Sequence, residues 1–272
     1  MRGRSVLILA GMTIGVVAVP AQEPSHTITQ TVQAGHPRVQ AEDGGVSEMM
    51  ESIVVSEKAQ APFTLMLETE WVRTLGDGGT ITLVNKRRIA RDAAGRVYQE
   101  RWFLVPKNGN VESQMTTIQI ADPKGHTLHN CFFFGPKKNV CELLNYSPSS
   151  PAVNTAEKDF TQDLGEGRGS YTHAYLGKQF VSGVETVGVR DTTIYNPGVF
   201  GNDRPVAVER ESWYSPQLDV NLLSVRSDPR TGKQTFTATV VTLGDPDPAL
   251  FQTPAGFTEV DHRQNHPQTQ NQ

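Results

Sequence analysis

Short segments of alternating hydrophobic and polar residues, separated by turn residues, repeat along most of this chain. In the first half the alternation predicts strands over 63–75, 80–90, 96–105, 111–120, 127–134 and 140–146. The connections are short and contain Gly, Pro, Asp and Asn, the residues that favour tight turns. We therefore expect an antiparallel meander, because parallel strands would need long crossover connections.

The pattern continues in the second half, with strands expected over 171–181 and 185–195 and a last short strand over 257–260. Residues 206–241 read as three strands joined by two turns. In the second turn Asp228 can accept hydrogen bonds from the backbone ahead, Pro229 fixes φ, and Gly232 takes the left-handed conformation. The whole pattern predicts a mainly β fold: a single curved antiparallel sheet (a half-barrel) of about ten to eleven strands with a few short helices.

Three segments are less regular. Residues 46–60 fit an amphipathic helix or the start of a strand, and we favour a short helix. Residues 147–169 are typical of a surface insertion, in which 156–164 could form one or two helical turns. Residues 248–251 can form a single helical turn with Asp247 near its start.

The strands expected over 68–75, 81–90 and 96–104 alternate imperfectly and carry many charged residues. One face of this part of the sheet is therefore expected to be solvated, or to line a groove that is only partly filled.

The N-terminus has the features of a secretory signal peptide. Arg2 and Arg4 precede an apolar stretch over 5–19, and small residues follow, so we expect cleavage near Ala21. The alternative is an uncleaved membrane anchor, but the apolar stretch is short for a membrane span. Cleavage predicts a periplasmic or secreted protein.

The expected organisation is a signal peptide over 1–21, a disordered linker over 22–45, one β domain over 46–261 and a disordered tail over 262–272. The net charge of −4 gives no electrostatic case for nucleic-acid binding.

The two cysteines, Cys131 and Cys141, flank a predicted hairpin turn and fall opposite each other or one place off. Such positions suit a disulfide, which an exported protein can form. The alternative is a pair of buried thiols that act as small hydrophobic side chains.

No stretch predicts an enzyme. The sequence has no Gly-x-Ser-x-Gly or Ser-x-x-Lys motif and no phosphate-binding loop, so we name no catalytic residue and no cofactor. His126, His129 and Cys131 invite a metal site, but zinc-type ligand spacings are missing and alternation puts His126 on the other face, so no metal site is predicted.

Trp71, Trp102 and Trp213 each fall inside a predicted strand, and Phe132, Phe133 and Phe134 are consecutive. Core packing is one explanation. The run of three must nevertheless place a ring on each face, and a curved sheet that holds an apolar ligand would use such rings. The three tryptophans are the candidates for lining a ligand site.

Several motifs resemble the LolA-like superfamily of periplasmic lipoprotein carriers, which includes LolB and the RseB sensor domain. They are GRVYQERWF (95–103), IQIADPKG (118–125), LGKQFVSGVETVGVRDTTI (176–194), ESWYSPQLDVNLLSVRSDPRTG (211–232) and PDPALFQTPAGFTEV (246–260). The resemblance implies a curved half-barrel whose concave side is plugged by short helices over an apolar cavity. In carriers the cavity takes acyl chains, and in sensors it reads envelope components.

Two functions follow as expectations. The first is an exported binding protein that holds an apolar small molecule, an acyl chain or a lipidated peptide. The second is an envelope module that binds a partner protein and has a filled core. The volume of any cavity should discriminate between them.

Overall fold

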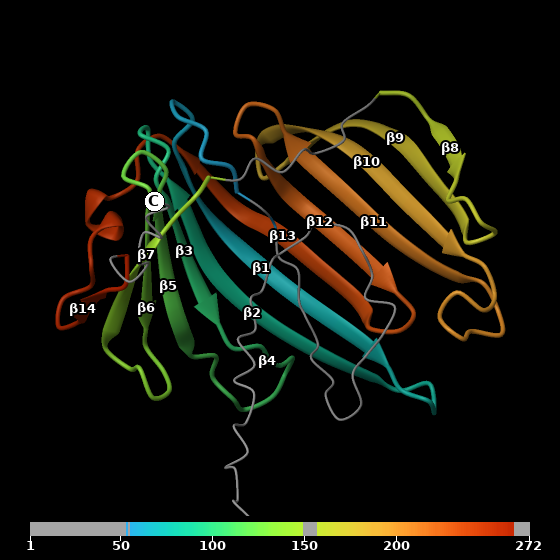
Figure 1. The fold of residues 1–272 in the computed structure, drawn as a ribbon, viewed down its shortest axis with the longest axis horizontal. Coiled ribbons are helices and arrows are strands. Elements are labelled where there is room, and N and C mark those ends of the chain that lie inside the picture. The colour runs from blue at the N-terminus through green and yellow to red at the C-terminus, as the bar shows by residue number, and fades with distance from the viewer. Residues whose placement is uncertain (1–52, 54, 149–156, 264–272) are drawn as a thin grey trace, which may run out of the picture. The chain divides into compact units, whose positions relative to one another are not determined.

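The computed structural model describes residue 53, residues 55–148 and residues 157–263. These residues form one open sheet of fourteen strands, in the order β14-β7-β6-β5-β3-β2-β1-β13-β12-β11-β10-β9-β8, with β4 paired to β2 outside this path (Figure 1). The strands are β1 (Phe63–Thr74), β2 (Thr80–Arg91), β3 (Val97–Trp102), β4 (Val105–Pro106), β5 (Met115–Asp122), β6 (Thr127–Phe132), β7 (Val140–Asn145), β8 (Phe160–Asp163), β9 (Gly169–Val181), β10 (Val184–Tyr195), β11 (Val206–Ser215), β12 (Val220–Asp228), β13 (Gly232–Leu243) and β14 (Thr258–Asp261).

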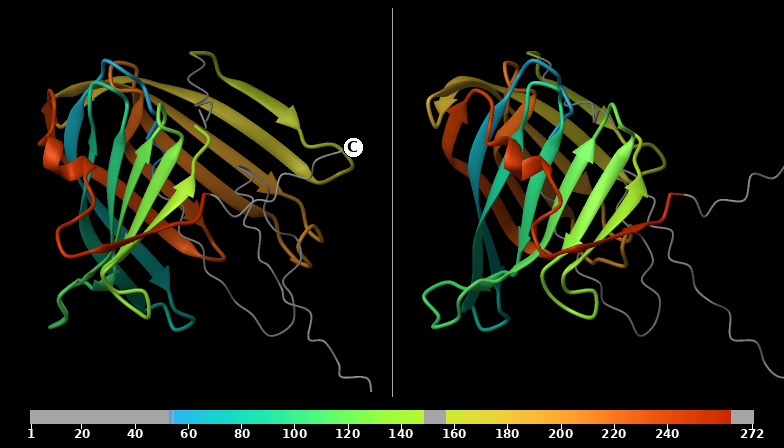
Figure 2. Two further views of the ribbon diagram at one scale, coloured as in Figure 1. Left: turned by 60° about the vertical axis from the view of Figure 1, so that its left-hand side comes forward. Right: turned by 90° about the vertical axis from the view of Figure 1, so that its left-hand side faces the viewer.

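The mainly β fold with a single open sheet is confirmed, and the two views in Figure 2 show how the strands twist along it. The predicted turn after β12 is also confirmed. The Asp228 carboxylate accepts a hydrogen bond from the N–H of Arg230 at 2.9 Å, and Gly232 has φ +93°. The sequence predicts this turn because its hydrogen bonds join residues that are close together in the chain.

Three details of the expected fold were wrong. The sheet has fourteen strands rather than ten or eleven, partly because the expected strand over 96–105 is divided into β3 and β4. Helical turns were expected over 156–164, but Phe160–Asp163 pairs with β9 as β8. The C-terminal β14 pairs with β7 in parallel, whereas an antiparallel sheet was expected throughout.

The described residues contain one helix, the 3₁₀ helix η1 (Pro248–Phe251), which lies where a helical turn was expected. Its cap is Asp247, whose carboxylate accepts a hydrogen bond from the N–H of Ala249. No helix in the described part of the chain is long and apolar enough to span a membrane.

The remaining predictions at the N-terminus and in the C-terminal tail concern residues largely outside the described ranges. The signal peptide, the linker and most of the expected helix over 46–60 belong to this group. Within that last segment Val55 forms an isolated β-bridge with Val220, as the strand alternative allowed.

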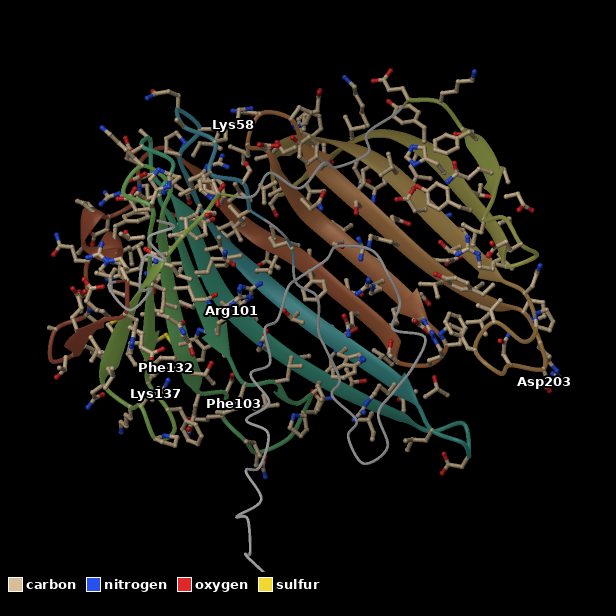
Figure 3. The ribbon with its side chains drawn as sticks, viewed as in Figure 1. Lys58, Arg101, Phe103, Phe132, Lys137 and Asp203 are labelled. Atoms are coloured by element: carbon tan, nitrogen blue, oxygen red, sulfur yellow. A yellow bond between two sulfur atoms is a disulfide. The ribbon has the colours of Figure 1, made fainter. Side chains whose placement is uncertain are left out.

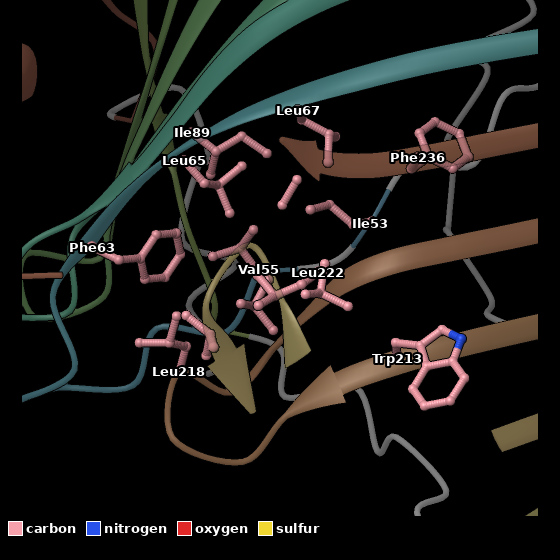
Figure 4. Packing of buried hydrophobic residues seen from close by; sticks show 14 of the residues in the cluster. Ile53, Val55, Phe63, Leu65, Leu67, Ile89, Trp213, Leu218, Leu222 and Phe236 are labelled. Carbon is pink, nitrogen blue, oxygen red and sulfur yellow. The ribbon is translucent and has the colours of Figure 1, made fainter. Parts of the chain in front are cut away.

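Alternation along β1 divides the sheet into two faces. Phe63, Leu65 and Leu67 point to one face, the core face, and are fully buried. Ile53 and Val55 pack on this face, among the side chains of β1 and those that follow β11 (Figure 4). The opposite face, the groove face, carries the intervening β1 side chains and a second apolar cluster around Tyr98, Ile118, Ile120, Cys131, Cys141 and Phe251.

Arg91 holds the segment before β1 against the sheet. The side chain is fully buried, and its guanidinium donates to the carbonyl oxygens of Ala61 (2.7 and 3.0 Å), Ser56 (2.8 Å) and Leu218 (2.5 Å). The ring of Phe63 lies 4.8 Å from the guanidinium carbon. Burial lowers the pKa of Arg91 to about 10.

Candidate functional site: a groove where two strands separate

Strands β2 and β3 separate after a short ladder. Their ladder has three residue pairs, the first between Arg91 and Val97 and the last between Ile89 and Gln99. At Leu83 and Val84, β2 pairs with β4 instead (Figure 1). Within the described ranges, the backbone of β2 between these two ladders therefore has no strand partner on that side.

Side chains take over the missing ladder contacts. The Asn85 side-chain amide donates to the carbonyl oxygen of Trp102 at 2.9 Å, and Arg87 Nη1 donates to that of Glu100 at 3.3 Å. In the other direction, the backbone N–H of Arg88 donates to Glu100 Oε2 at 3.0 Å. These bonds satisfy polar groups that a continuous ladder would have paired.

A groove of about 810 Å³ lies over this separation on the groove face. Its apolar lining comes from Met66, Val84, Trp102 and Val105, and its charged lining comes from Glu68, Glu70, Lys86, Arg88, Glu100 and Lys107. The remaining lining residues are Thr69, Asn85, Ser113, Thr235 and Thr237. The groove lies on the three charged strands that were expected to be solvated or to line a partly filled groove.

Glu100 is the most buried charged residue of this lining, at 8% exposure. Its carboxylate accepts hydrogen bonds from Tyr98 Oη (3.0 Å) and Trp102 Nε1 (2.9 Å) as well as from the N–H of Arg88. Burial and the neighbouring carboxylate raise the pKa of the Tyr98 phenol far above its ordinary range. Glu100 therefore fixes the indole of Trp102 in one orientation.

The rim carries acid–base pairs. Lys86 Nζ lies 2.5 Å from Glu68 Oε1, and Lys107 Nζ lies 2.5 Å from Glu70 Oε2. These side chains are about half exposed, so each pair contributes little to stability and can exchange its partner at low cost.

The structure places the three candidate tryptophans in different surroundings. Trp102 lines the groove. Trp71 lies on the core face at 7% exposure, and its Nε1 donates to the carbonyl oxygen of Thr231 at 2.8 Å. Trp213, at 9% exposure, lies over Gly188, where an added Cβ would come within 2.4 Å of the ring. The predicted ligand role of the three stays a prediction, and Trp102 alone of them contacts this groove.

The three consecutive phenylalanines have different surroundings. Alternation along a strand had predicted that at least two of them lie on opposite faces. Phe132 lies under Lys137 Nζ, which is 5.5 Å from the ring centroid. Phe133 packs against Phe257 with centroids 4.8 Å apart, and Phe134 is 54% exposed.

Cys131 and Cys141 form a disulfide and occupy directly opposed positions of β6 and β7. Both are fully buried beside the groove-face cluster. Within the described ranges no group of three or more His, Cys, Asp or Glu side chains could hold a metal ion.

Sequence reasoning found the charged strands but not the separation of β2 and β3 or the part played by Glu100. The motif Glu100-x-Trp102 carries a usable signal, because residues two apart on a strand share a face. The same spacing recurs at Glu211 and Trp213, where Nε1 donates to Glu211 Oε1 at 2.8 Å.

Comparison with known proteins gives likenesses of low identity. No family model and no curated sequence matches the chain. Among solved structures, the MucA/MucB complex of Pseudomonas aeruginosa has 12% identity and a TM-score of 0.38, over 75% of this chain and 59% of that chain. An uncharacterised conserved protein from Thermus thermophilus has 10% identity and a TM-score of 0.36, over 74% and 90% of the two chains.

An outer membrane lipoprotein-sorting protein domain from Vibrio parahaemolyticus has 9% identity and a TM-score of 0.17, over 70% and 89% of the two chains. In the match to the MucA/MucB complex, the chain spans less than two thirds of the length of the matched protein. Likeness at this level assigns no activity.

Proposed function

We propose that this protein is an exported envelope module that binds an extended polypeptide segment in the groove over β1, β2 and β3. The observation that carries the proposal is the composition of the groove: an oriented tryptophan beside a rim of exchangeable acid–base pairs.

The rim favours a polypeptide over an acyl chain. An acyl chain laid along the groove would remove Lys86, Glu68 and their neighbours from water without offering them polar partners, which is costly. A polypeptide offers backbone donors and acceptors and charged side chains, so it can replace each rim contact that it displaces.

Trp102 supplies the anchor. Tryptophan is enriched among the residues that carry most of the energy of protein interfaces. Since Glu100 holds the Trp102 indole in place, little conformational entropy is lost when a ligand packs against the ring.

The groove offers no arrangement for catalysis among its lining residues. Its Ser113 hydroxyl donates to the carbonyl oxygen of Phe103 at 2.6 Å, and the Glu100 carboxylate already accepts three hydrogen bonds. A nucleophile paired with a base is therefore missing from the lining, and binding is the function that the geometry supports.

Export is part of the proposal. The disulfide between Cys131 and Cys141 suits an oxidising compartment, and the N-terminal residues 1–21 have the pattern of a cleavable signal peptide. The N-terminal sequence of the protein recovered from the envelope fraction tests this: a start at Gln22 supports it, and a retained Met1 contradicts it.

The test is fluorescence titration of the exported protein with defined labelled peptides. One peptide alternates Lys and Glu with apolar residues, a second has the same composition with the charges in blocks, and an acyl-chain probe completes the set. We expect the alternating peptide to bind most tightly, and Trp102→Ala to weaken it by about tenfold or more.

Phe180→Ala is the matched control, because Phe180 is a 72% exposed ring on the distant strand β9. It should leave peptide binding unchanged. Equal binding by wild type and the Trp102 variant, or tight binding of the acyl probe alone, would overturn the proposal in favour of another site or an apolar ligand.

A further inference from the structure

Two arginines face each other on the core face, behind the groove. Arg87 and Arg101 lie two residues beyond the last ladder pair, Ile89 with Gln99, so alternation places both side chains on the same face across the separation. Arg87 is 4% exposed. Figure 3 shows Arg101 in the middle of the sheet, away from its edges.

Arg101 has no acidic partner among the residues that the structure describes. Its Nε donates to the side-chain oxygen of Gln119 at 3.0 Å, and no carboxylate of the described residues lies within ion-pair distance of its guanidinium. Burial lowers the pKa of Arg101. The pKa of Arg87 is lowered to about 9 by burial and by repulsion from Arg101, although the charge of Glu100 acts in the opposite direction. The Arg101 charge is therefore costly to bury, and an added anion beside it would reduce that cost.

Amide side chains occupy neighbouring positions on the same face of the sheet. Gln99 is paired in register with Gln119, and Gln119 with Asn130. The side-chain oxygens of Gln99 and Asn130 are buried and accept no hydrogen bond from the described residues. The side-chain amides of Gln99 and Asn130 can rotate by 180° without breaking a hydrogen bond at the oxygen. The rotation places the NH₂ group, a donor, where the oxygen was.

We propose that Arg101 and Arg87 form a binding site for a phosphate group, with the amide side chains as additional donors. Planar guanidiniums bind phosphate oxygens with paired hydrogen bonds, which point charges cannot do. Phosphate is favoured over a carboxylate because it offers more acceptor oxygens to the donors that gather here. This site lies on the face opposite the groove and does not depend on the proposed polypeptide.

The test is thermal unfolding of the exported protein in increasing inorganic phosphate at constant ionic strength. Phosphate should raise the Tm in wild type, because a ligand that binds the folded state stabilises it. Arg101→Gln should weaken phosphate binding by about tenfold or more, the loss of a charge-assisted hydrogen bond. Arg190→Gln, which changes an exposed arginine on β10 that pairs with Glu211, should respond as wild type does.

Arg101→Gln should also fold at least as stably as wild type without phosphate, because it removes a charge that burial disfavours and that has no acidic partner among the described residues. If the variant fails to fold, NMR of the arginine Nε–H groups in wild type replaces it. Phosphate should then shift the signals of Arg87 and Arg101 and leave that of Arg190 in place.

Short-chain phosphatidic acid and the matching uncharged diacylglycerol distinguish the sources of the phosphate. If inorganic phosphate and phosphatidic acid both bind, the ligand is a free phosphate or any phosphoryl group. If phosphatidic acid alone binds, the ligand is a lipid headgroup. The proposal is overturned if neither phosphate binds, if the diacylglycerol binds equally well, or if Arg101→Gln responds to phosphate as wild type does.

Discussion

Glu100 shows how a single residue can organise a binding surface. Its buried carboxylate accepts hydrogen bonds from the Tyr98 hydroxyl, the Trp102 indole and the backbone N–H of Arg88. The two side-chain donors are its neighbours on the same face of β3, and the third comes from β2 at the point of separation. One acceptor thus joins two strands that no longer share a ladder.

Removing one of these donors should weaken the fold. Tyr98→Phe is expected to lower the free energy of unfolding by about 1.5–3 kcal/mol at neutral pH, because the buried carboxylate loses a hydrogen bond. Urea unfolding measures the loss. Tyr195→Phe is the control, since the Tyr195 hydroxyl makes no hydrogen bond to a described residue; an equal loss in both variants would contradict the assignment.

The raised pKa of Tyr98 gives a pH dependence with a definite sign. In the unfolded chain the phenol ionises near its ordinary value of 10.0, while in the folded protein it stays protonated well above that pH. The folded state therefore holds one more proton, and stability falls as pH rises through 10. The stability difference between wild type and Tyr98→Phe should shrink over that range, and a constant difference would contradict the raised pKa.

At the scale of elements, the sheet depends on two side-chain connections between its segments. Arg91 bonds the carbonyls of Ala61 and Ser56 before β1 and that of Leu218 before β12. The disulfide joins β6 and β7 at opposed positions. Without Arg91, only side-chain packing would hold the segment before β1 against the sheet. Without the disulfide, only the hairpin hydrogen bonds would join β6 to β7.

Arg91→Met should destabilise the protein by about 3–5 kcal/mol, because it leaves buried carbonyl groups without donors. Hydrogen exchange should quicken first around residues 55–61, which Arg91 holds against the sheet. Arg88→Met changes an exposed arginine of the same strand and should cost little. A loss within about 0.5 kcal/mol for Arg91→Met, a typical surface value, would show that the connection is dispensable.

Removing the disulfide should have a smaller effect. The bond closes a loop with a sequence separation of 10, so Cys131→Ala with Cys141→Ala is expected to cost about 2–3 kcal/mol. Alkylation of the denatured protein without reductant provides the direct check. Two free thiols in protein isolated from the envelope would contradict the bond.

The sequence predicted elements better than it predicted their connections. Strand positions and the turn at Asp228 and Gly232 follow from local alternation and local hydrogen bonds, and both are confirmed. The role of Arg91 could not be predicted, because no local pattern reveals that its guanidinium reaches a carbonyl 127 residues away. The parallel pairing of β14 with β7 could not be predicted either, because the two strands are far apart in the sequence.

At the scale of the whole sheet, the two faces differ in chemistry. The core face combines a tight apolar cluster with the pair Arg87 and Arg101, whereas the groove face is open and lined by acid–base pairs over β1 to β3. Charge in the strands predicted a solvated face. The location of the groove could not be predicted, because it depends on where two strands stop pairing.

The face that a ligand contacts tests the central claim most directly. Methyl and indole NMR signals of the exported protein can be followed during titration with the alternating-charge peptide. We predict shifts at the Trp102 indole and at the methyl groups of Met66, Val84 and Val105, with Leu65 and Leu67 unchanged. Shifts confined to Leu65, Leu67 and their core-face neighbours, or no shifts at all, would contradict a polypeptide-binding groove.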